Sequence, residues 1–341
     1  MSDRMVRGAV VVTAVRCAIA GLAGVLLAGT AQAEPVTPEW ISAPDGSRVV
    51  SFAEGRAGID LTIYSALMGR AVVLKVLRAP DDSTPAPTLY LLNGSDGGAD
   101  KNWADATDVV EFFADKQVNV VIPFGGGGSY FTDWRADDPA LGTQRWATFL
   151  TRELPPIIDA TLKTTGANAI AGISMSGTAV FQLALTAPGV YRAIGSYSGC
   201  VRTSDPRGQA VVNAVVTSQQ GNTVNMWGPP GDPAWAANDP YLHAEKLRGT
   251  AIYVASGNGR PGPLDTVDGV HGDLVQLAYQ YMFGAPLEAI ANVCTQQLRD
   301  RLRELDIPAT VDLRTTGTHS WGYWQQDLHN SWPIFSAALN R

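Results

Sequence analysis

A serine stands where an apolar run turns into a helix-favouring segment, and this placement could support nucleophilic chemistry. The run Ala169–Ile173 leads directly into Gly172-Ile173-Ser174-Met175-Ser176-Gly177. A tight strand-to-helix turn projects a serine hydroxyl above a sheet, and it needs small neighbours because the turn is crowded. Gly172 meets this need, and so does Ser176, which replaces the second glycine of the general Gly-x-Ser-x-Gly pattern. We therefore predict that Ser174 is a nucleophile.

A serine hydroxyl becomes a good nucleophile when a histidine removes its proton and an acid orients that histidine. In folds with such a turn the chain order is serine, acid, histidine, and the histidine follows the last strand. His319 fits because it lies in Gly317-Thr318-His319-Ser320-Trp321, shortly after the predicted strand Ala309–Leu313. We predict His319 as the base and interpret the other histidines as structural: His243, His271 and His329.

The acid is not singled out by the pattern. Candidates follow the predicted strand Ala251–Ala255 and precede His319, namely Asp265, Asp268, Asp273 and Glu288. Strand order alone favours an aspartate soon after the strand, because acids in such sites commonly lie on the loop that the strand delivers.

The negative oxygen of an acyl-transfer intermediate needs two backbone N–H donors. One should be the residue after the nucleophile, Met175, and the other should lie in the loop after an early strand. The loop after Thr88–Leu92 begins Asn93-Gly94-Ser95-Asp96, and Ser95 is our candidate for the second donor. Metal-ligand spacing such as His-Glu-x-x-His does not occur, so we predict no metal and no cofactor.

Apolar, β-favouring runs alternate with helical segments through most of the chain, which predicts an α/β fold. Several runs are continuously apolar, as in a mostly parallel central sheet that is covered by helices on both faces. The predicted strands are Ala71–Leu77, Thr88–Leu92, Val118–Pro123, Ala169–Ile173, Ala193–Tyr197, Ala251–Ala255 and Ala309–Leu313. The predicted helices are Asp105–Asp115, Thr143–Lys163, Met175–Ala187, Leu274–Phe283 and Glu288–Leu305. The stretch 200–248 interrupts this alternation and is interpreted as an ordered excursion.

Residues 1–33 have the pattern of an export signal. Arg4 and Arg7 precede the apolar run Cys17–Thr30, and Ala31-Gln32-Ala33 fits a cleavage site. A retained membrane anchor is the alternative, but Arg16 interrupts the longer apolar stretch. We therefore expect a signal peptide over 1–33, cleavage near Ala33, and one domain over 34–341 of a secreted or cell-envelope protein.

Two features of the remaining chain bear on its partners and its stability. Removal of the signal leaves Cys200 and Cys294 of the three cysteines, and an even pair in an exported protein predicts a disulfide. The formal net charge of the full chain is −7, which excludes a basic nucleic-acid-binding surface.

Taken together, several motifs resemble the secreted mycolyltransferases of the antigen 85 type. They are Tyr90-Leu91-Leu92-Asn93-Gly94, Tyr130-Phe131-Thr132-Asp133-Trp134, the elbow around Ser174, Met226-Trp227-Gly228-Pro229, Asp232-Pro233-Ala234-Trp235, Gly257-Asn258-Gly259 and Gly317-Thr318-His319-Ser320-Trp321. The resemblance implies an α/β-hydrolase fold and a serine acyltransferase that moves a mycolic acyl chain from a trehalose monomycolate-like glycolipid to a sugar hydroxyl.

The resemblance also assigns residues. It implies Glu288 as the acid, counted back from Arg299-Asp300, and so overrules the early aspartate. It matches Ser95 and Met175 with the oxyanion positions. It implies substrate-binding roles for Asn93, Asp96, Asn102, Ser320 and Trp321. We expect a monomer that associates with the cell envelope and needs no cofactor.

One departure from the family stands in the loop after Leu92. The family commonly has Asp-Gly-Leu-Arg where this chain has Asn93-Gly94-Ser95-Asp96, and that Asp and Arg help to hold trehalose. The resemblance therefore leaves the sugar head group open. Two other functions stay open as well: a secreted carboxylesterase or thioesterase that uses water as acceptor, and a non-catalytic wall-binding protein on the same fold.

Overall fold

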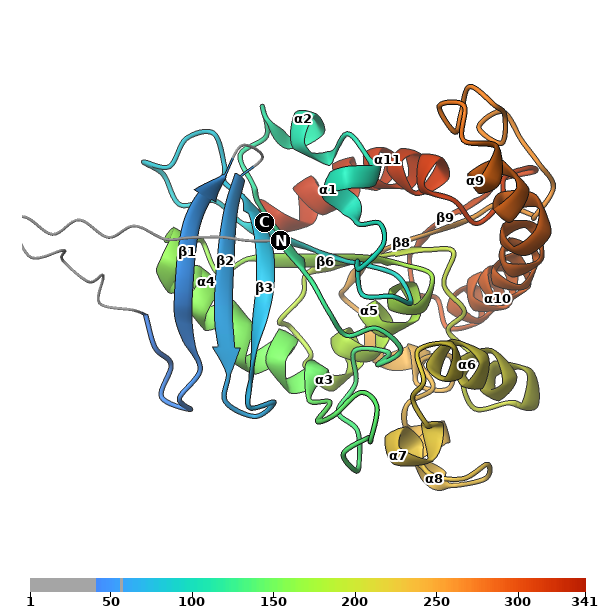
Figure 1. Cartoon of the computed structure of the whole chain (residues 1–341), viewed down its shortest axis with the longest axis horizontal. Helices are drawn as coiled ribbons and strands as arrows, with labels where there is room; N and C mark the ends of the chain where they lie inside the picture. The colour runs from blue at the N-terminus through green and yellow to red at the C-terminus, as the bar shows by residue number, and fades with distance from the viewer. Residues whose placement is uncertain (1–40, 56–57) are drawn as a thin grey trace, which may run out of the picture. The chain divides into compact units, whose positions relative to one another are not determined.

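A mixed sheet forms the centre of the computed structural model, which describes residues 41–55 and 58–341 (Figure 1). The predicted signal peptide lies outside the described residues. Within them the sheet has nine strands in the order β1-β2-β3-β5-β4-β6-β7-β8-β9. The strand bounds are β1 Arg48–Gly55, β2 Gly58–Ser65, β3 Arg70–Leu77, β4 Thr88–Leu92, β5 Asn119–Pro123, β6 Asn168–Ile173, β7 Ala193–Tyr197, β8 Ala251–Ser256 and β9 Thr310–Leu313.

The predicted α/β fold with a mostly parallel sheet is confirmed. Strands β5, β4, β6, β7, β8 and β9 pair in parallel, whereas β1, β2 and β3 pair antiparallel and join the sheet through β5. The seven predicted strands are all present, but the sequence analysis missed β1 and β2. Most residues of β1 are exposed, so this edge strand carries no apolar run that could mark it.

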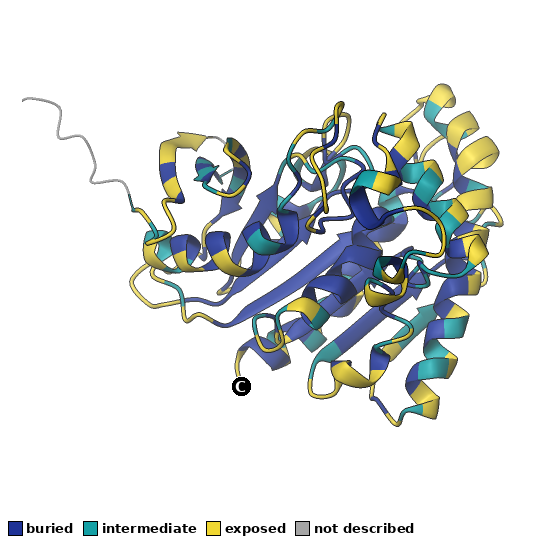
Figure 2. Ribbon diagram, turned by 90° about the horizontal axis from the view of Figure 1, so that it is seen from below, coloured by how far each residue is buried: buried dark blue, intermediate teal, exposed yellow. Residues whose placement is uncertain are grey.

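Helices cover both faces of the sheet, as predicted. Two hydrophobic clusters, one on each face, result from the alternation of side chains along the strands. On β4, Tyr90 packs with α4 and α5, whereas Leu91 packs with α1, α2 and α11. Figure 2 shows the buried strands between helices whose outward sides are exposed. The helix bounds are α1 Trp103–Ala106, α2 Val109–Phe113, α3 Trp146–Thr148, α4 Leu154–Leu162, α5 Met175–Thr186, α9 Leu274–Tyr279, α10 Ala285–Glu304 and α11 Trp321–Leu339.

A π-helical turn interrupts the predicted helix Thr143–Lys163, and another joins the predicted helices Leu274–Phe283 and Glu288–Leu305 into one continuous run. Segment η1 (Phe149–Glu153) precedes Pro155, and η3 (Gln280–Gly284) joins α9 to α10 just before Pro286. A proline has no N–H to donate, and a π-turn absorbs the resulting break in the helical ladder. The prediction of one helix over Asp105–Asp115 is wrong, because α1 and α2 are separate short helices there.

The excursion predicted for residues 200–248 is ordered and mainly helical. It contains α6 (Pro206–Ser218), α7 (Thr223–Trp227), α8 (Pro233–Ala237) and the 3₁₀ turn η2 (Ala244–Leu247). The buried side chains of Trp227 and Trp235 pack edge to face and anchor it. Among the described residues, no helix has both the length and the apolar character that a membrane crossing requires.

The register of the parallel strands brings their carboxyl ends to one edge. Leu92 of β4 pairs with Gly172 of β6, Ile173 pairs with Tyr197 of β7, and Tyr197 pairs with Ala255 of β8. The loops that follow these strands therefore start side by side, which is where ligand sites lie in sheets of this kind.

Candidate active site

Ser174 occupies the strained turn that the sequence predicts between β6 and α5. Its φ of 54° and ψ of −120° are rare for a residue with a side chain, and such strain is often stored at functional sites. Its N–H donates to the carbonyl of Tyr197 at the end of β7 (2.9 Å). A Cβ on Gly172 would lie 2.6 Å from Ser176 Oγ, so only glycine fits before this turn.

Ser176 shows why the second glycine of the general pattern is dispensable here. Its buried hydroxyl accepts from the N–H of Ile173 (2.9 Å) and lies within hydrogen-bonding distance of the carbonyl of Leu92 (3.1 Å). The side chain therefore joins the end of β4 to the turn that carries Ser174. A glycine at this position would lose both contacts.

Glu288 and His319 form a direct pair. The Nδ1–H of His319 donates to Glu288 Oε2 at 2.8 Å, and the Glu288 side chain is fully buried. The other carboxylate oxygen accepts from Ser198 Oγ (2.9 Å) and from the N–H of Gly257 (2.5 Å). Trp324 donates its indole N–H to Ser198 Oγ (3.0 Å), and its ring meets the His319 ring edge on. Packing and hydrogen bonds thus fix the imidazole.

These contacts connect the serine turn to the histidine pair through β7. The backbone N–H of Ser174 is hydrogen-bonded to the carbonyl of Tyr197. The next residue after Tyr197, Ser198, is hydrogen-bonded through its hydroxyl to Glu288. Ser198 has a φ of 58°, which turns the chain sharply after the strand. The loops after β6, β7 and β8 and the loop after β9 therefore converge on one rim.

The early aspartate that strand order favours has a different partner. Asp265 is buried and accepts from Tyr323 Oη (2.9 Å), from the N–H of Gly262 (2.8 Å) and from the hydroxyl of Thr318. Asp265 therefore holds the backbone beside His319, but it is not the carboxylate that contacts the imidazole. The preference for an early aspartate, which came from strand order, is therefore wrong. Glu288, the residue that the family resemblance implies, makes the contact with His319.

The two predicted oxyanion donors lie on neighbouring loops. Met175 is the first residue of α5, and the first N–H groups of a helix have no acceptor within it. Ser95 lies in the loop after β4, and its carbonyl accepts from the N–H of Gly128 (2.9 Å). Gly94 approaches the side chain of Ile173, which ends β6, so this loop packs against the serine turn.

Three residues that the family resemblance assigns to substrate binding also organise the loop after β4. Asn93 is fully buried, donates to the carbonyl of Pro123 (3.1 Å) and accepts from the N–H of Trp103 (3.3 Å). The Asp96 carboxylate accepts from backbone N–H groups of its own loop. Asn102 caps α1 through its side-chain oxygen. Their polar atoms bind the protein itself, and the sugar-binding role that the family resemblance implies for these side chains stays a prediction.

Ser320 and Trp321 lie directly after His319. Ser320 precedes the first turn of α11 and is nearly buried. Trp321 is partly exposed, and its ring meets those of Trp103 (5.5 Å between centroids) and Trp324 (5.1 Å) edge on. An exposed indole held by two other indoles is a rigid platform of the kind on which sugars and acyl chains pack.

Sequence reasoning missed two charged residues behind Glu288. Arg314 Nη2 lies 3.9 Å from Glu288 Oε1, and Arg314 Nη1 is paired with the buried Asp327 of α11. Burial raises the pKa of Asp327 to about 7, although the Arg314 charge opposes this rise. No motif marks such a pair, because its members come from a strand end and from a helix interior.

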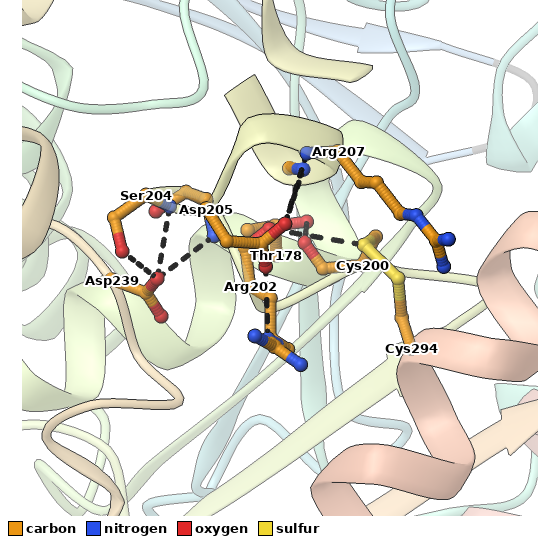
Figure 3. Close-up of a disulfide and its surroundings, with 10 residues drawn as sticks. Thr178, Cys200, Arg202, Ser204, Asp205, Arg207, Asp239 and Cys294 are labelled. Carbon is orange, nitrogen blue, oxygen red and sulfur yellow. Dashed lines mark hydrogen bonds and ion pairs between the residues drawn. A yellow bond between two sulfur atoms is a disulfide. The ribbon is translucent and has the colours of Figure 1, made fainter. Parts of the chain in front are cut away.

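The disulfide that the two cysteines predict is confirmed. Cys200, in the loop after β7, is bonded to Cys294 on α10 (Figure 3). Within residues 41–55 and 58–341, no group of three or more His, Cys, Asp or Glu side chains is placed to hold a metal ion.

Comparisons with known proteins identify the family of the chain. The family described as "Putative esterase" matches residues 65–333. The chain is 32% identical to the diacylglycerol acyltransferase/mycolyltransferase Ag85B of Mycobacterium leprae, over 89% of this chain and 91% of that one. It is 30% identical to Ag85A of Mycobacterium tuberculosis, over 95% and 94%.

Solved structures share the fold. The structure of Mycobacterium tuberculosis MPT51 (FbpC1) superposes with a TM-score of 0.68 at 23% identity, covering 85% of this chain and 99% of that one. A ferulic acid esterase superposes with a TM-score of 0.57 at 18% identity, covering 86% and 99%. The chain therefore belongs to this esterase family of the α/β-hydrolase fold and, through its similarity to Ag85A and Ag85B, to the acyltransferases within it.

Proposed function

We propose that the protein transfers a long-chain, mycolic-type acyl group between sugar hydroxyls, of trehalose or of the cell wall, through an acyl-enzyme on Ser174. The names of the relatives support the acyl group, and the family supports the reaction class. Residues 1–33 support export to the cell envelope, where such lipids and sugars would meet.

One observation carries the proposal of a long acyl chain: an exposed apolar face beside His319. The N–H of His319 donates to the carbonyl of Gly284, the last residue of η3 (3.3 Å). Large apolar side chains with 44–81% of their surface exposed line this segment, namely Leu274, Val275, Tyr279, Met282, Phe283 and Leu287. Such a surface is costly to expose to water. The tail of an acyl group that is attached at the reaction centre would extend over this surface and cover it.

The first half of the reaction forms the acyl-enzyme. The Glu288 contact fixes the proton on His319 Nδ1, which leaves Nε2 as the basic nitrogen. Nε2 takes the Ser174 proton while Ser174 Oγ attacks the donor ester carbonyl. The negative charge of Glu288 then stabilises the imidazolium, and the N–H groups of Met175 and Ser95 stabilise the oxyanion. The imidazolium returns the proton to the departing sugar oxygen.

The second half reverses these roles. An acceptor sugar hydroxyl gives its proton to His319 and attacks the acyl carbon, after which Ser174 leaves and regains its proton. Transfer wins over hydrolysis when the sugar displaces water from this position. Trp321 and Ser320 would contact the sugar, whereas Asn93, Asp96 and Asn102 position the loop that carries Ser95.

Replacement of the nucleophile tests the mechanism. Ser174→Ala should lower turnover by roughly 10⁴- to 10⁶-fold while the far-UV spectrum and the melting temperature stay native. Ser218→Ala, on the exposed end of α6, serves as the matched control and should keep full activity. Near-normal turnover of the Ser174→Ala variant would overturn the mechanism.

The acceptor is tested with labelled trehalose monomycolate and free trehalose. The proposal expects labelled dimycolate, or exchange of label into free trehalose. Release of free acid alone would indicate a hydrolase. Failure of a serine-directed phosphonate to label Ser174, together with no turnover, would indicate a non-catalytic binding protein.

A further inference from the structure

The Glu288 carboxylate has a charged neighbour that does not touch the reacting atoms. Arg314 Nη2 lies 3.9 Å from Glu288 Oε1, on the side away from His319 Nδ1. Arg314 follows β9, and its N–H donates to the carbonyl of Ser256 at the end of β8 (2.9 Å). Its guanidinium also lies 5.2 Å from the centre of the Tyr323 ring. The backbone and this ring therefore hold the guanidinium beneath Glu288.

Arg314 is shared between two buried carboxylates. Its Nη1 is paired with Asp327 Oδ1, and the side chains of both Asp327 and Glu288 have no exposed surface. Among the described residues, Arg314 Nε and Nη2 and Asp327 Oδ2 have no hydrogen-bond partner. Nη2 thus acts on Glu288 through its charge, and a charge interaction of this kind is strong where water is excluded.

We propose that Arg314 and Asp327 form a positioning pair that sets the balance of charge on the Glu288–His319 couple. The proposal rests on the function proposed above, because it assigns how that couple is tuned. Neither residue touches substrate. Arg314 favours the negative charge of Glu288 and disfavours a positive imidazolium. Asp327 offsets part of the Arg314 charge once it loses its proton, above about pH 7.

Other titratable groups face this pair from each neighbouring element. Asp312 lies on β9, Tyr253 on β8, Tyr197 on β7 and Tyr323 on α11. Burial raises the pKa of each of the three tyrosines above its ordinary value, so they are neutral in the working range. Asp312, Glu288 and Arg314 are then the charges that bear on His319, and Asp327 joins them as pH rises through about 7.

The pair predicts opposite effects for its two members. Arg314→Met removes a positive charge, so the imidazolium becomes easier to form and the His319 titration moves to higher pH. Asp327→Asn keeps the shape and removes the negative charge that Asp327 carries above about pH 7, so the His319 titration moves to lower pH in that range. The Arg314→Met shift should be the larger of the two, because Arg314 is the member that lies beside Glu288. A purely structural role would move both variants in the same direction or neither.

The test measures the His319 titration by NMR and the acid limb of kcat/KM with a short-chain ester in the same variants. Arg314→Lys keeps the charge and should stay close to the wild type. The double variant Arg314→Met/Asp327→Asn should fall between the two single variants. Asp60→Asn and Lys75→Met break an ion pair at β2 and β3 and serve as matched controls with wild-type profiles. Shifts of the same sign, or no shift in folded variants, would overturn the proposal.

The two readouts separate this inference from the proposed function. If the wild type shows no Ser174-dependent turnover, the proposed function fails, but the NMR titration still reports whether the pair acts on His319. If turnover is present and the titration of His319 is unchanged in both variants, the positioning pair fails alone.

Discussion

Glu288 and Cys294 lie on the same helix, α10, so the disulfide from Cys294 to Cys200 fixes the helix that carries the carboxylate beside His319. Cys200 lies two residues after Ser198, which is itself bonded to Glu288. The bridge thus ties α10 to the loop after β7 at the rim of the site. A covalent link here restrains both the unfolded chain and the acid's helix.

Loss of the disulfide should cost both stability and turnover. In a Cys200→Ser/Cys294→Ser variant the free energy of unfolding should fall by about 2–4 kcal/mol, because the bridge closes a long loop of 94 residues. Urea denaturation measures this loss, and kcat should fall with it as α10 loosens. Dithiothreitol should destabilise the wild type and leave the variant unchanged. Equal stability of the two proteins without reductant would contradict this expectation.

The identity of the acid can be tested with two isosteric changes. Glu288→Gln keeps the shape and removes the charge that stabilises the imidazolium, so kcat should fall by roughly 10⁴-fold. Asp265→Asn disturbs the contacts with Tyr323, Gly262 and Thr318 but keeps the Glu288–His319 contact, so its kcat should fall far less. Steady-state kinetics on an activated ester compare the two variants. If folded Asp265→Asn lost as much activity as Glu288→Gln, the acid would be misassigned.

The serine turn should tolerate no side chain at Gly172. A Cβ there would lie 2.6–2.7 Å from Ser176 atoms, two of them backbone, so Gly172→Ala must displace the turn. We expect loss of phosphonate labelling and a clear drop in melting temperature, since overpacking commonly costs about 1–3 kcal/mol. Gly94→Ala is the matched control, because its Cβ would meet Ile173 at an ordinary 3.6 Å. A fully labelled, stable Gly172→Ala protein would refute the crowded turn.

Asp327 should make stability fall as pH rises. Its folded-state pKa of about 7 lies above the ordinary 3.8, so the folded state holds this proton more tightly than the unfolded state does. The contribution is complete below about pH 4 and is lost as pH rises through 7. The free energy of unfolding should therefore fall by about 2–3 kcal/mol between pH 5 and pH 8. The Asp327→Asn variant has no proton to lose at this position. Its free energy of unfolding relative to the wild type should therefore rise by the same amount from pH 5 to pH 8, as measured by urea denaturation. A constant difference would count against the raised pKa.

The sequence by itself determined the features that depend on near neighbours. The serine turn follows from the small residues two positions before and two positions after Ser174, Gly172 and Ser176. The parallel strands follow from apolar runs that are buried on both faces. The position of His319 after the last strand follows from chain order. The disulfide follows from the two cysteines that lie outside the predicted signal, Cys200 and Cys294. Each of these features depends on a short segment of sequence or on the order of segments along the chain.

Only the tertiary structure decided which distant groups meet. Glu288 contacts His319 from a different element, and no local spacing distinguishes it from Asp265. The exposed edge strand β1 is held by pairing with β2 and carries no pattern of its own. The roles of Asn93, Arg314 and Asp327 depend on which polar partners the fold places within contact distance of their side chains. Hydrogen bonds and charges act through space, so their partners are fixed only when the chain has folded.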